Sequence, residues 1–191
     1  MPAPTIHGFA EKVALVINGS EGVGRAVALQ LALQGCYVIV SFQKTSDEQT
    51  NALEELKSLG TLANAFEFVD AKSLINEVNN LFGRLDLLVN CVKSEDDSTF
   101  QIKTLTVEAL DLLKFRPKPS IVNVLFDNQE IYFFENLPDK IRQNCVVIKP
   151  INEVKEHGLF SVNNYDDTAR VVLFFLSSEA KSLNKQVLYV N

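Results

Sequence analysis

The amino-acid sequence predicts an α/β protein with three layers, in which helices cover both faces of a doubly wound, mainly parallel seven-stranded sheet. Short continuous apolar runs, typical of strands buried on both faces, alternate along the chain with segments of helical period. A glycine-rich turn joins the first apolar run to the first helical segment. The 191 residues contain no repeat, linker or low-complexity segment, so we expect a single domain over 1–191.

Strands and helices alternate strictly in the first half of the sequence. Each predicted helix there ends at a glycine, Gly35, Gly60 or Gly83, the residue that best adopts the left-handed conformation after a helix. Since connections between parallel strands are right-handed crossovers, we expect these strands to form a parallel sheet. The predicted strands are 12–17, 36–42, 63–70 and 85–90, and the predicted helices are 24–34, 47–60 and 73–83.

The second half of the sequence is less regular. The polar segment 93–99 predicts an exposed loop, and the following helix ends before the prolines of RPKP because proline cannot continue a helix. Segment 127–140 is ambiguous, and we expect a turn and one short helix there. The last helix is apolar on nearly every side in its middle, so we expect it to pack against the sheet. The remaining predicted strands are 120–126, 144–150 and 186–191, and the remaining helices are 104–115 and 166–180.

Charge and hydropathy exclude several classes of function. The net charge of −6 gives no excess of positive charge that would attract nucleic acid or anionic lipid. No apolar stretch reaches the roughly 18 residues that a membrane span needs, and the N-terminal MPAPTIHGFAEK is not typical of a signal peptide. We therefore expect no nucleic-acid or membrane partner and a cytoplasmic location.

The cysteines and histidines do not indicate a redox or metal site. Cys36, Cys91 and Cys145 are odd in number, widely spaced and placed in or beside apolar runs, which favours buried small hydrophobes in a reducing cytosol. His7 and His157 are too few and too distant for a histidine metal site. We expect no metal.

The segment INGSEGVGR (17–25) is the sharpest local signal. It follows a strand and opens a helix, whose N-terminal amides and partial positive charge suit a pyrophosphate. Gly22 and Gly24 have the G-x-G spacing that lets the backbone turn tightly and approach a ligand. Glu21 would repel a phosphate unless it points away. Two readings stay open at this stage: a dinucleotide site, or a tight strand–helix turn with no ligand.

The sequence resembles the short-chain dehydrogenases/reductases, in order and along nearly the whole chain. The resemblance implies a Rossmann fold of the kind that binds NAD(P). It is carried by KVALVINGSEGVGRAVALQLALQGCYVIV for the first strand–helix–strand unit, RLDLLVN for the fourth strand, SIVNV for the fifth, IRQNCVVIKP for the sixth, and DDTARVVLFFLSSEAKSLNKQVLYVN for the last helix and strand.

The nucleotide-binding motifs of that family are only partly kept. In the family's T-G-x-x-x-G-x-G loop, Ile17 replaces the threonine and Asn18 the first glycine. Asparagine is the non-glycine residue that best tolerates a positive φ, so the turn itself can survive. After the fourth strand only Asn90 matches the family's N-N-A-G run.

The family's catalytic groups are missing. Leu125 and Phe126 follow Val124, at the end of the fifth strand where the resemblance would place a catalytic serine. The family's Y-x-x-x-K pair is not present either, since Asn136 stands four residues after Tyr132 and Lys140 stands eight after it. The connection after the fifth strand is too short for the serine loop and the tyrosine–lysine helix, and 92–119 is short for the helix pair that carries the catalytic asparagine. We therefore interpret the chain as a shortened, catalytically degenerate member of this family, and we predict no catalytic residue.

Residues that match the family's cofactor cleft remain candidates for NAD(P) binding. The resemblance places Asp70 at the acidic position that faces the adenine, and Lys44 near a ribose 2′-phosphate if it is not simply solvated. Without the ribose-clamping lysine, we expect any remaining site to hold the adenine half better than the nicotinamide half. The candidates are Asn18, Ser20, Gly22, Val23, Gly24, Lys44, Asp70 and Asn90.

Three functional hypotheses follow. The first is a non-catalytic binding or scaffold protein that forms a homodimer through residues 166–191, because the resemblance implies dimers of this kind; simple core packing of the apolar run 171–176 is the alternative. Any protein partner is unknown. The second is an NAD(P)-binding sensor without turnover. The third is a divergent NAD(P)-dependent oxidoreductase with a rebuilt site around Tyr132 or an acid from a partner chain.

Overall fold

The computed structural model describes residues 8–43, 47–91, 98–126, 137–148 and 165–190. Within these ranges seven strands form one sheet, and every pair of neighbouring strands is parallel. The order across the sheet is β3-β2-β1-β4-β5-β6-β7, so the predicted doubly wound α/β class is confirmed. The strands are β1 (Val13–Ile17), β2 (Tyr37–Phe42), β3 (Ala63–Glu67), β4 (Leu87–Cys91), β5 (Ser120–Phe126), β6 (Arg142–Ile148) and β7 (Val187–Val190).

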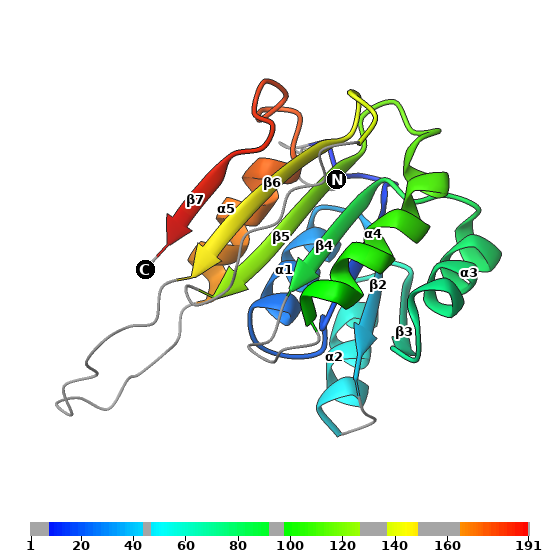
Figure 1. Ribbon diagram of the computed structural model, residues 1–191. Helices are drawn as coiled ribbons and strands as arrows, with labels where there is room; N and C mark the ends of the chain where they lie inside the picture. The colour runs from blue at the N-terminus through cyan, green and yellow to red at the C-terminus, as the bar shows by residue number, and fades with distance from the viewer. Residues whose placement is uncertain (1–7, 44–46, 92–97, 127–136, 149–164, 191) are drawn as a thin grey trace, which may run out of the picture.

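Helices cover both faces of this sheet (Figure 1). Side chains of a strand point to opposite faces in alternation, so each face has its own core. Val16 and Val89 pack with α1, α2 and α5, whereas Leu15 and Leu88 pack with α3 and α4. The helices are α1 (Gly22–Leu33), α2 (Asp47–Ser58), α3 (Ala71–Phe82), α4 (Ser98–Leu113) and α5 (Tyr165–Leu176).

The predicted glycine helix ends are confirmed. Gly35, Gly60 and Gly83 have φ of +80°, +77° and +60° and follow α1, α2 and α3. Asn18 has φ +52°, as the substitution of asparagine for glycine predicts. These positions were predictable because glycine and asparagine adopt the left-handed conformation at the least cost.

Several predicted boundaries were wrong. Helix α4 begins at Ser98 rather than at 104, because the polar segment contains no helix breaker after that serine. Strand β3 ends at Glu67 rather than 70, and α3 begins at Ala71 rather than 73, since the Asp70 carboxylate accepts the Ser73 amide and so caps the helix. The predicted turn and short helix over 127–140 lie mostly outside the described residues, as do 93–97 of the predicted loop 93–99.

Helix α5 ends at Leu176 rather than at 180, and β6 begins at Arg142 rather than at 144. The same residue explains both corrections. Arg142 pairs in register with Ser120 of β5, and its guanidinium donates four hydrogen bonds to carbonyls at and beyond the end of α5. Carbonyl groups at the end of a helix lack partners within the helix. The Arg142 guanidinium supplies donors for them and so fixes the end of α5 against β6. The bonds run from Nη1 to the Phe175 (2.8 Å) and Ala180 (2.9 Å) oxygens and from Nη2 to the Leu176 (3.2 Å) and Ser177 (2.9 Å) oxygens.

A buried carboxylate joins the amino ends of β1 and β4. Asp86 is 4% exposed; its Oδ2 accepts the Val13 amide at 2.9 Å and the Arg84 Nε at 3.0 Å. Its Oδ1 accepts the Arg116 Nε at 2.7 Å. Burial would raise the pKa of Asp86, but the Val13 amide and the two guanidinium groups outweigh burial and hold the pKa below its usual value. This network lies at the edge of the sheet opposite the strand ends where ligands bind in such folds.

All three cysteines are buried, as the sequence predicted. No helix in the described part of the chain is long and apolar enough to cross a membrane.

Candidate functional site

The sheet has its switch point between β1 and β4, the central neighbours from which the strand order runs outward in both directions. In doubly wound sheets, ligands bind outside the carboxyl ends of the strands at this point. Figure 1 shows the arrowheads of β1's neighbours and the start of α1 at one edge of the sheet. The candidate site is therefore the turn from Ile17 to Gly22 together with the end of β4.

The glycines of this turn are required by the fold itself. Gly22 has φ +52°. A Cβ on Gly24 would lie 2.2 Å from the Asn18 carbonyl oxygen, and a Cβ on Gly19 would lie 2.6 Å from Val40 Cγ1. Both distances are far below van der Waals contact, so helix α1 docks on the turn only with glycine at these places. Because the fold alone explains these glycines, their presence does not by itself indicate a ligand.

Asn18 connects three strands at the switch point. Its backbone amide donates to the Ser41 Oγ at the end of β2 at 3.3 Å, and its side-chain Nδ2 donates to the Cys91 carbonyl at the end of β4 at 2.7 Å. Asn18 is 8% exposed. A glycine at this position would make only the backbone bond, so the side-chain bridge from β1 to β4 is specific to this chain's asparagine.

Asn90 lies inside the layer between the sheet and α4. Its side chain is fully buried, and its Nδ2 donates to the Asn123 Oδ1 at 2.9 Å and the Thr106 Oγ1 at 3.4 Å. Its Oδ1 has no hydrogen-bond partner within the described residues. The structure thus gives Asn90 a place in a buried polar cluster, and its role toward a cofactor stays a prediction.

Asp70 and the other candidates are more dispersed. The Asp70 carboxylate caps α3, accepting the Ser73 hydroxyl at 2.7 Å and the Ser73 amide at 2.9 Å. These two hydrogen bonds, the side-chain one first, lower the pKa of Asp70. Ser20 and Val23 are buried in the turn and the first turn of α1. Lys44 lies outside the described residues. The structure therefore places Asn18, Ser20, Gly22, Val23 and Gly24 in one turn and Asn90 on β4 opposite Ile17 of that turn, whereas Asp70 lies at the start of α3.

The thiol at the switch point is not a nucleophile. Cys91 is 5% exposed, and burial raises the pKa of its thiol to about 12. It is therefore a neutral, inert thiol at physiological pH.

Sequence reasoning missed one residue of the site. The ring of Tyr165, at the first position of α5, lies over Gly22: a Cβ built on that glycine would be 3.9 Å from its Cε2 and Cζ atoms. Tyr165 is half-buried and packs on the core shared by α1 and α5. Nothing in the local sequence signals this contact, because the two residues are brought together only when α5 packs against α1.

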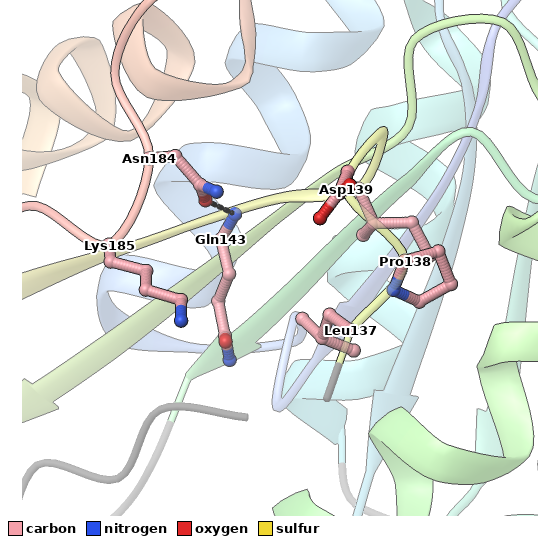
Figure 2. A pocket seen from close by; sticks show the side chains of 7 residues that line it. Leu137, Pro138, Asp139, Gln143, Asn184 and Lys185 are labelled. Atoms are coloured by element: carbon pink, nitrogen blue, oxygen red, sulfur yellow. Dashed lines mark hydrogen bonds between the residues drawn. The ribbon is translucent and has the colours of Figure 1, made fainter. Parts of the chain in front are cut away.

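A polar pocket of about 140 Å³ lies elsewhere, at the amino end of β6. Figure 2 shows the Gln143 side chain between Lys185 and Leu137, with the Asn184 amide oxygen accepting the Gln143 backbone amide at 2.9 Å. The other lining residues are Pro138, Asp139 and Ile141. Since this is the opposite edge of the sheet from the switch point, the pocket is separate from the candidate site.

Comparison with known proteins decides the family. The family model described as short chain dehydrogenase matches residues 12–124, from the residue before β1 to Val124 in β5. The chain belongs to the short-chain dehydrogenase family. The matched part of this short-chain dehydrogenase homologue includes the glycine turn and the switch point, and it ends before the β5–β6 connection.

Curated relatives match the homologue over part of their length. The 3-oxoacyl-[acyl-carrier-protein] reductase FabG of Staphylococcus aureus is 39% identical over 84 residues, which is 41% of this chain and 34% of the reductase. The NADPH-dependent aldehyde reductase 1, chloroplastic, of Arabidopsis thaliana is 25% identical over 94% of this chain and 63% of its own length. The chain thus spans about a third of the first relative's length and less than two thirds of the second's.

Solved structures share the fold of the homologue. A short chain dehydrogenase from Burkholderia cenocepacia, in complex with NADP, has a TM-score of 0.76 at 20% identity, covering 96% of this chain and 97% of that chain. A hydroxysteroid dehydrogenase from Escherichia coli has a TM-score of 0.77 at 18% identity, covering 96% of both chains. At these identities the likeness shows the fold.

Proposed function

We propose that this short-chain dehydrogenase homologue is a non-catalytic binding or scaffold protein. The observation that carries the proposal is the connection between β5 and β6. The two strands are parallel neighbours from Ser120↔Arg142 to Phe126↔Ile148, so residues 127–141 make the whole crossover. That crossover contains Tyr132 followed four residues later by Asn136, without the family's Y-x-x-x-K pair.

The end of β5 supports the same proposal. Leu125 is 7% exposed and packs with Cys145 and Val147, so its side chain is part of a small apolar cluster. Hydride transfer to a carbonyl needs a positioned proton donor near the reacting oxygen. A leucine in the place of the family's serine offers no such group.

A second candidate function is an NAD(P)-binding sensor without turnover. It is favoured by the glycine turn, which has kept the backbone geometry of Gly22 and the close approach at Gly24. Solved neighbours of the same fold are complexes with NADP and with NAD. We also propose a cytoplasmic location, which the three buried free thiols support.

The test of the proposed function is cofactor oxidation. The purified protein is incubated with NADH or NADPH and a panel of ketones and aldehydes, and the loss of reduced cofactor is followed by absorbance. We expect no rate above the protein-free control. A steady rate that disappears in Tyr132→Phe would contradict the proposal and favour the divergent oxidoreductase, in which Tyr132 supplies the proton. A rate unchanged by that substitution would contradict the proposal as well, and would indicate that a residue other than Tyr132 donates the proton.

We further propose that the protein forms a homodimer through α5 and β7. The proposal is supported by large apolar side chains left exposed there: Phe174 is 41%, Leu188 43% and Tyr189 52% exposed. β7 is also an edge strand of the sheet. Exposed strand edges and clustered apolar side chains favour association.

The dimer is tested by light scattering coupled to gel filtration. The unsubstituted protein is expected to elute with the mass of a dimer, and the double variant Leu188→Glu/Tyr189→Glu with the mass of a monomer, because two carboxylates would be buried in the interface. Phe115→Glu, at a 76% exposed phenylalanine after α4, is the matched control and should leave the mass unchanged. A monomeric unsubstituted protein, or a dimer that persists in the double variant, would refute this interface.

A further inference from the structure

Two side chains, those of Asn18 and Tyr165, lie beside the glycine turn at the switch point. We propose that the side chains of Asn18 and Tyr165 block the position at which the pyrophosphate of a dinucleotide would bind. These two side chains, rather than the glycine turn, would then determine which ligands this site accepts. The inference rests on the proposed function, since a protein without hydride transfer has no need of an open nicotinamide cleft. It predicts that the site excludes a dinucleotide until these side chains are removed.

The first contact is the bridge from Asn18. The 2.7 Å bond from Asn18 Nδ2 to the Cys91 carbonyl joins the carboxyl ends of β1 and β4, which are the two strands whose separation creates the crevice in a doubly wound sheet. The bond is buried, and the Asn18 backbone is held at the same time by the Ser41 Oγ on β2. Moving the amide away would break this buried hydrogen bond, which is unfavourable.

The second contact is the ring of Tyr165. A pyrophosphate binds at the N-terminus of the first helix, where the backbone of the second glycine lets it come close. In this chain that backbone belongs to Gly22, and carbon atoms of the Tyr165 ring lie 3.9 Å from the place a Cβ on Gly22 would take. The ring therefore faces the side of Gly22 on which glycine has no side chain, and it leaves room there for about one carbon atom.

The two contacts come from different parts of the chain and lie at the two ends of the turn from Asn18 to Gly22. Asn18 belongs to the turn after β1, and Tyr165 opens α5, which packs along α1. Asn18 bridges the ends of β1 and β4, and the Tyr165 ring faces Gly22 at the start of α1. A ligand with two linked phosphates must displace both side chains, whereas a ligand confined to the ends of β2 and β3 displaces neither.

The experiment measures dinucleotide affinity by titration calorimetry for the full chain and three variants. Asn18→Gly removes the bridge and suits the observed φ of +52°. Tyr165→Leu removes the ring but keeps an apolar side chain on the core. Lys185→Gly is the matched control, because Lys185 also has a positive φ, +56°, but lies at the opposite edge of the sheet. Circular dichroism checks that each variant is folded.

The expected result is that Asn18→Gly and Tyr165→Leu each bind NADH or NADPH about tenfold more tightly than the unsubstituted protein. Lys185→Gly should bind as the unsubstituted protein does. If Asn18→Gly fails to fold, the dinucleotide affinity of Tyr165→Leu tests the inference. Equal or weaker binding in the folded variants, including no binding by any of them, would overturn the inference. Cofactor oxidation by the unsubstituted protein would instead contradict the proposed function, so the two failures are distinguishable.

Discussion

Replacing Arg142 by methionine is expected to lower the free energy of unfolding by about 3 kcal/mol. The guanidinium donates to four carbonyl oxygens at the end of α5, all between 2.8 and 3.2 Å. Methionine keeps the aliphatic stem but removes all four guanidinium hydrogen bonds where the helix meets the sheet. The Phe175 and Ala180 carbonyls keep a second donor, from the Ser120 hydroxyl and the Leu183 amide, whereas the Leu176 and Ser177 carbonyls lose their charged donor. Hydrogen bonds to charged groups are worth more than neutral ones, and unsatisfied buried carbonyls are unfavourable. Urea denaturation followed by circular dichroism measures the loss.

Two further variants make the Arg142 experiment specific. Arg142→Lys should recover only a small part of the loss, because an ammonium group cannot span four carbonyls as the planar guanidinium does. Arg170→Met removes an arginine from α5 itself, where Arg170 and its partner Asp167 are each 71% exposed, and should change stability by less than about 0.5 kcal/mol. Equal losses in Arg142→Met and Arg170→Met would show that the cap does not hold α5 to the sheet.

Replacing Asp86 by asparagine is expected to lower the free energy of unfolding by about 2 kcal/mol at neutral pH. The carboxylate is nearly fully buried and is shared by the Val13 amide and the guanidinium groups of Arg84 and Arg116. Asparagine keeps the shape but loses the charge that both arginines need. Asp111→Asn is the matched control, since Asp111 is 84% exposed and its ion pair with Lys114 is solvated.

The same carboxylate sets part of the pH dependence of stability. Because the pKa of Asp86 is lower in the folded protein than in the unfolded chain, its contribution is complete above the unfolded value of about 4. The contribution is lost as the pH falls through the lower folded value. Stability of the unsubstituted protein should therefore decline on acidification more steeply than that of Asp86→Asn. Parallel curves would show that the charge of Asp86 does not stabilise the fold.

The sequence predicted the parts of the structure that depend on local pattern. The buried strands were recognised from their apolar runs, and the glycines at 35, 60 and 83 from their position after helical segments. The positive φ of Asn18 followed from its residue type. The predicted start of α4 was wrong because a polar segment without a helix breaker can still be helical. The predicted end of α5 was wrong because the group that caps this helix comes from Arg142, far earlier in the chain.

The contacts that define the candidate site could not be predicted in the same way. Asn18 and Cys91 are 73 positions apart, and only the pairing of β1 with β4 makes their bond. The Tyr165 ring reaches Gly22 because α5 packs on α1, and no pattern near either residue signals it. The resemblance implied a place for Asn90 in the cofactor cleft, which stays a prediction, but no local pattern indicated its bond to Asn123 in the polar cluster under α4. Such contacts depend on tertiary packing rather than on local spacing.

The central claim is that this member of the short-chain dehydrogenase family keeps the family's sheet without its hydride-transfer chemistry. The most direct test is a single-turnover experiment, with the protein in large excess over NADPH and a mixture of ketones and aldehydes present. With the protein in excess, even a single slow hydride transfer from each NADPH molecule is detected. The account predicts that the reduced cofactor remains unoxidised and that no alcohol product is formed. Stoichiometric formation of NADP and an alcohol would contradict it.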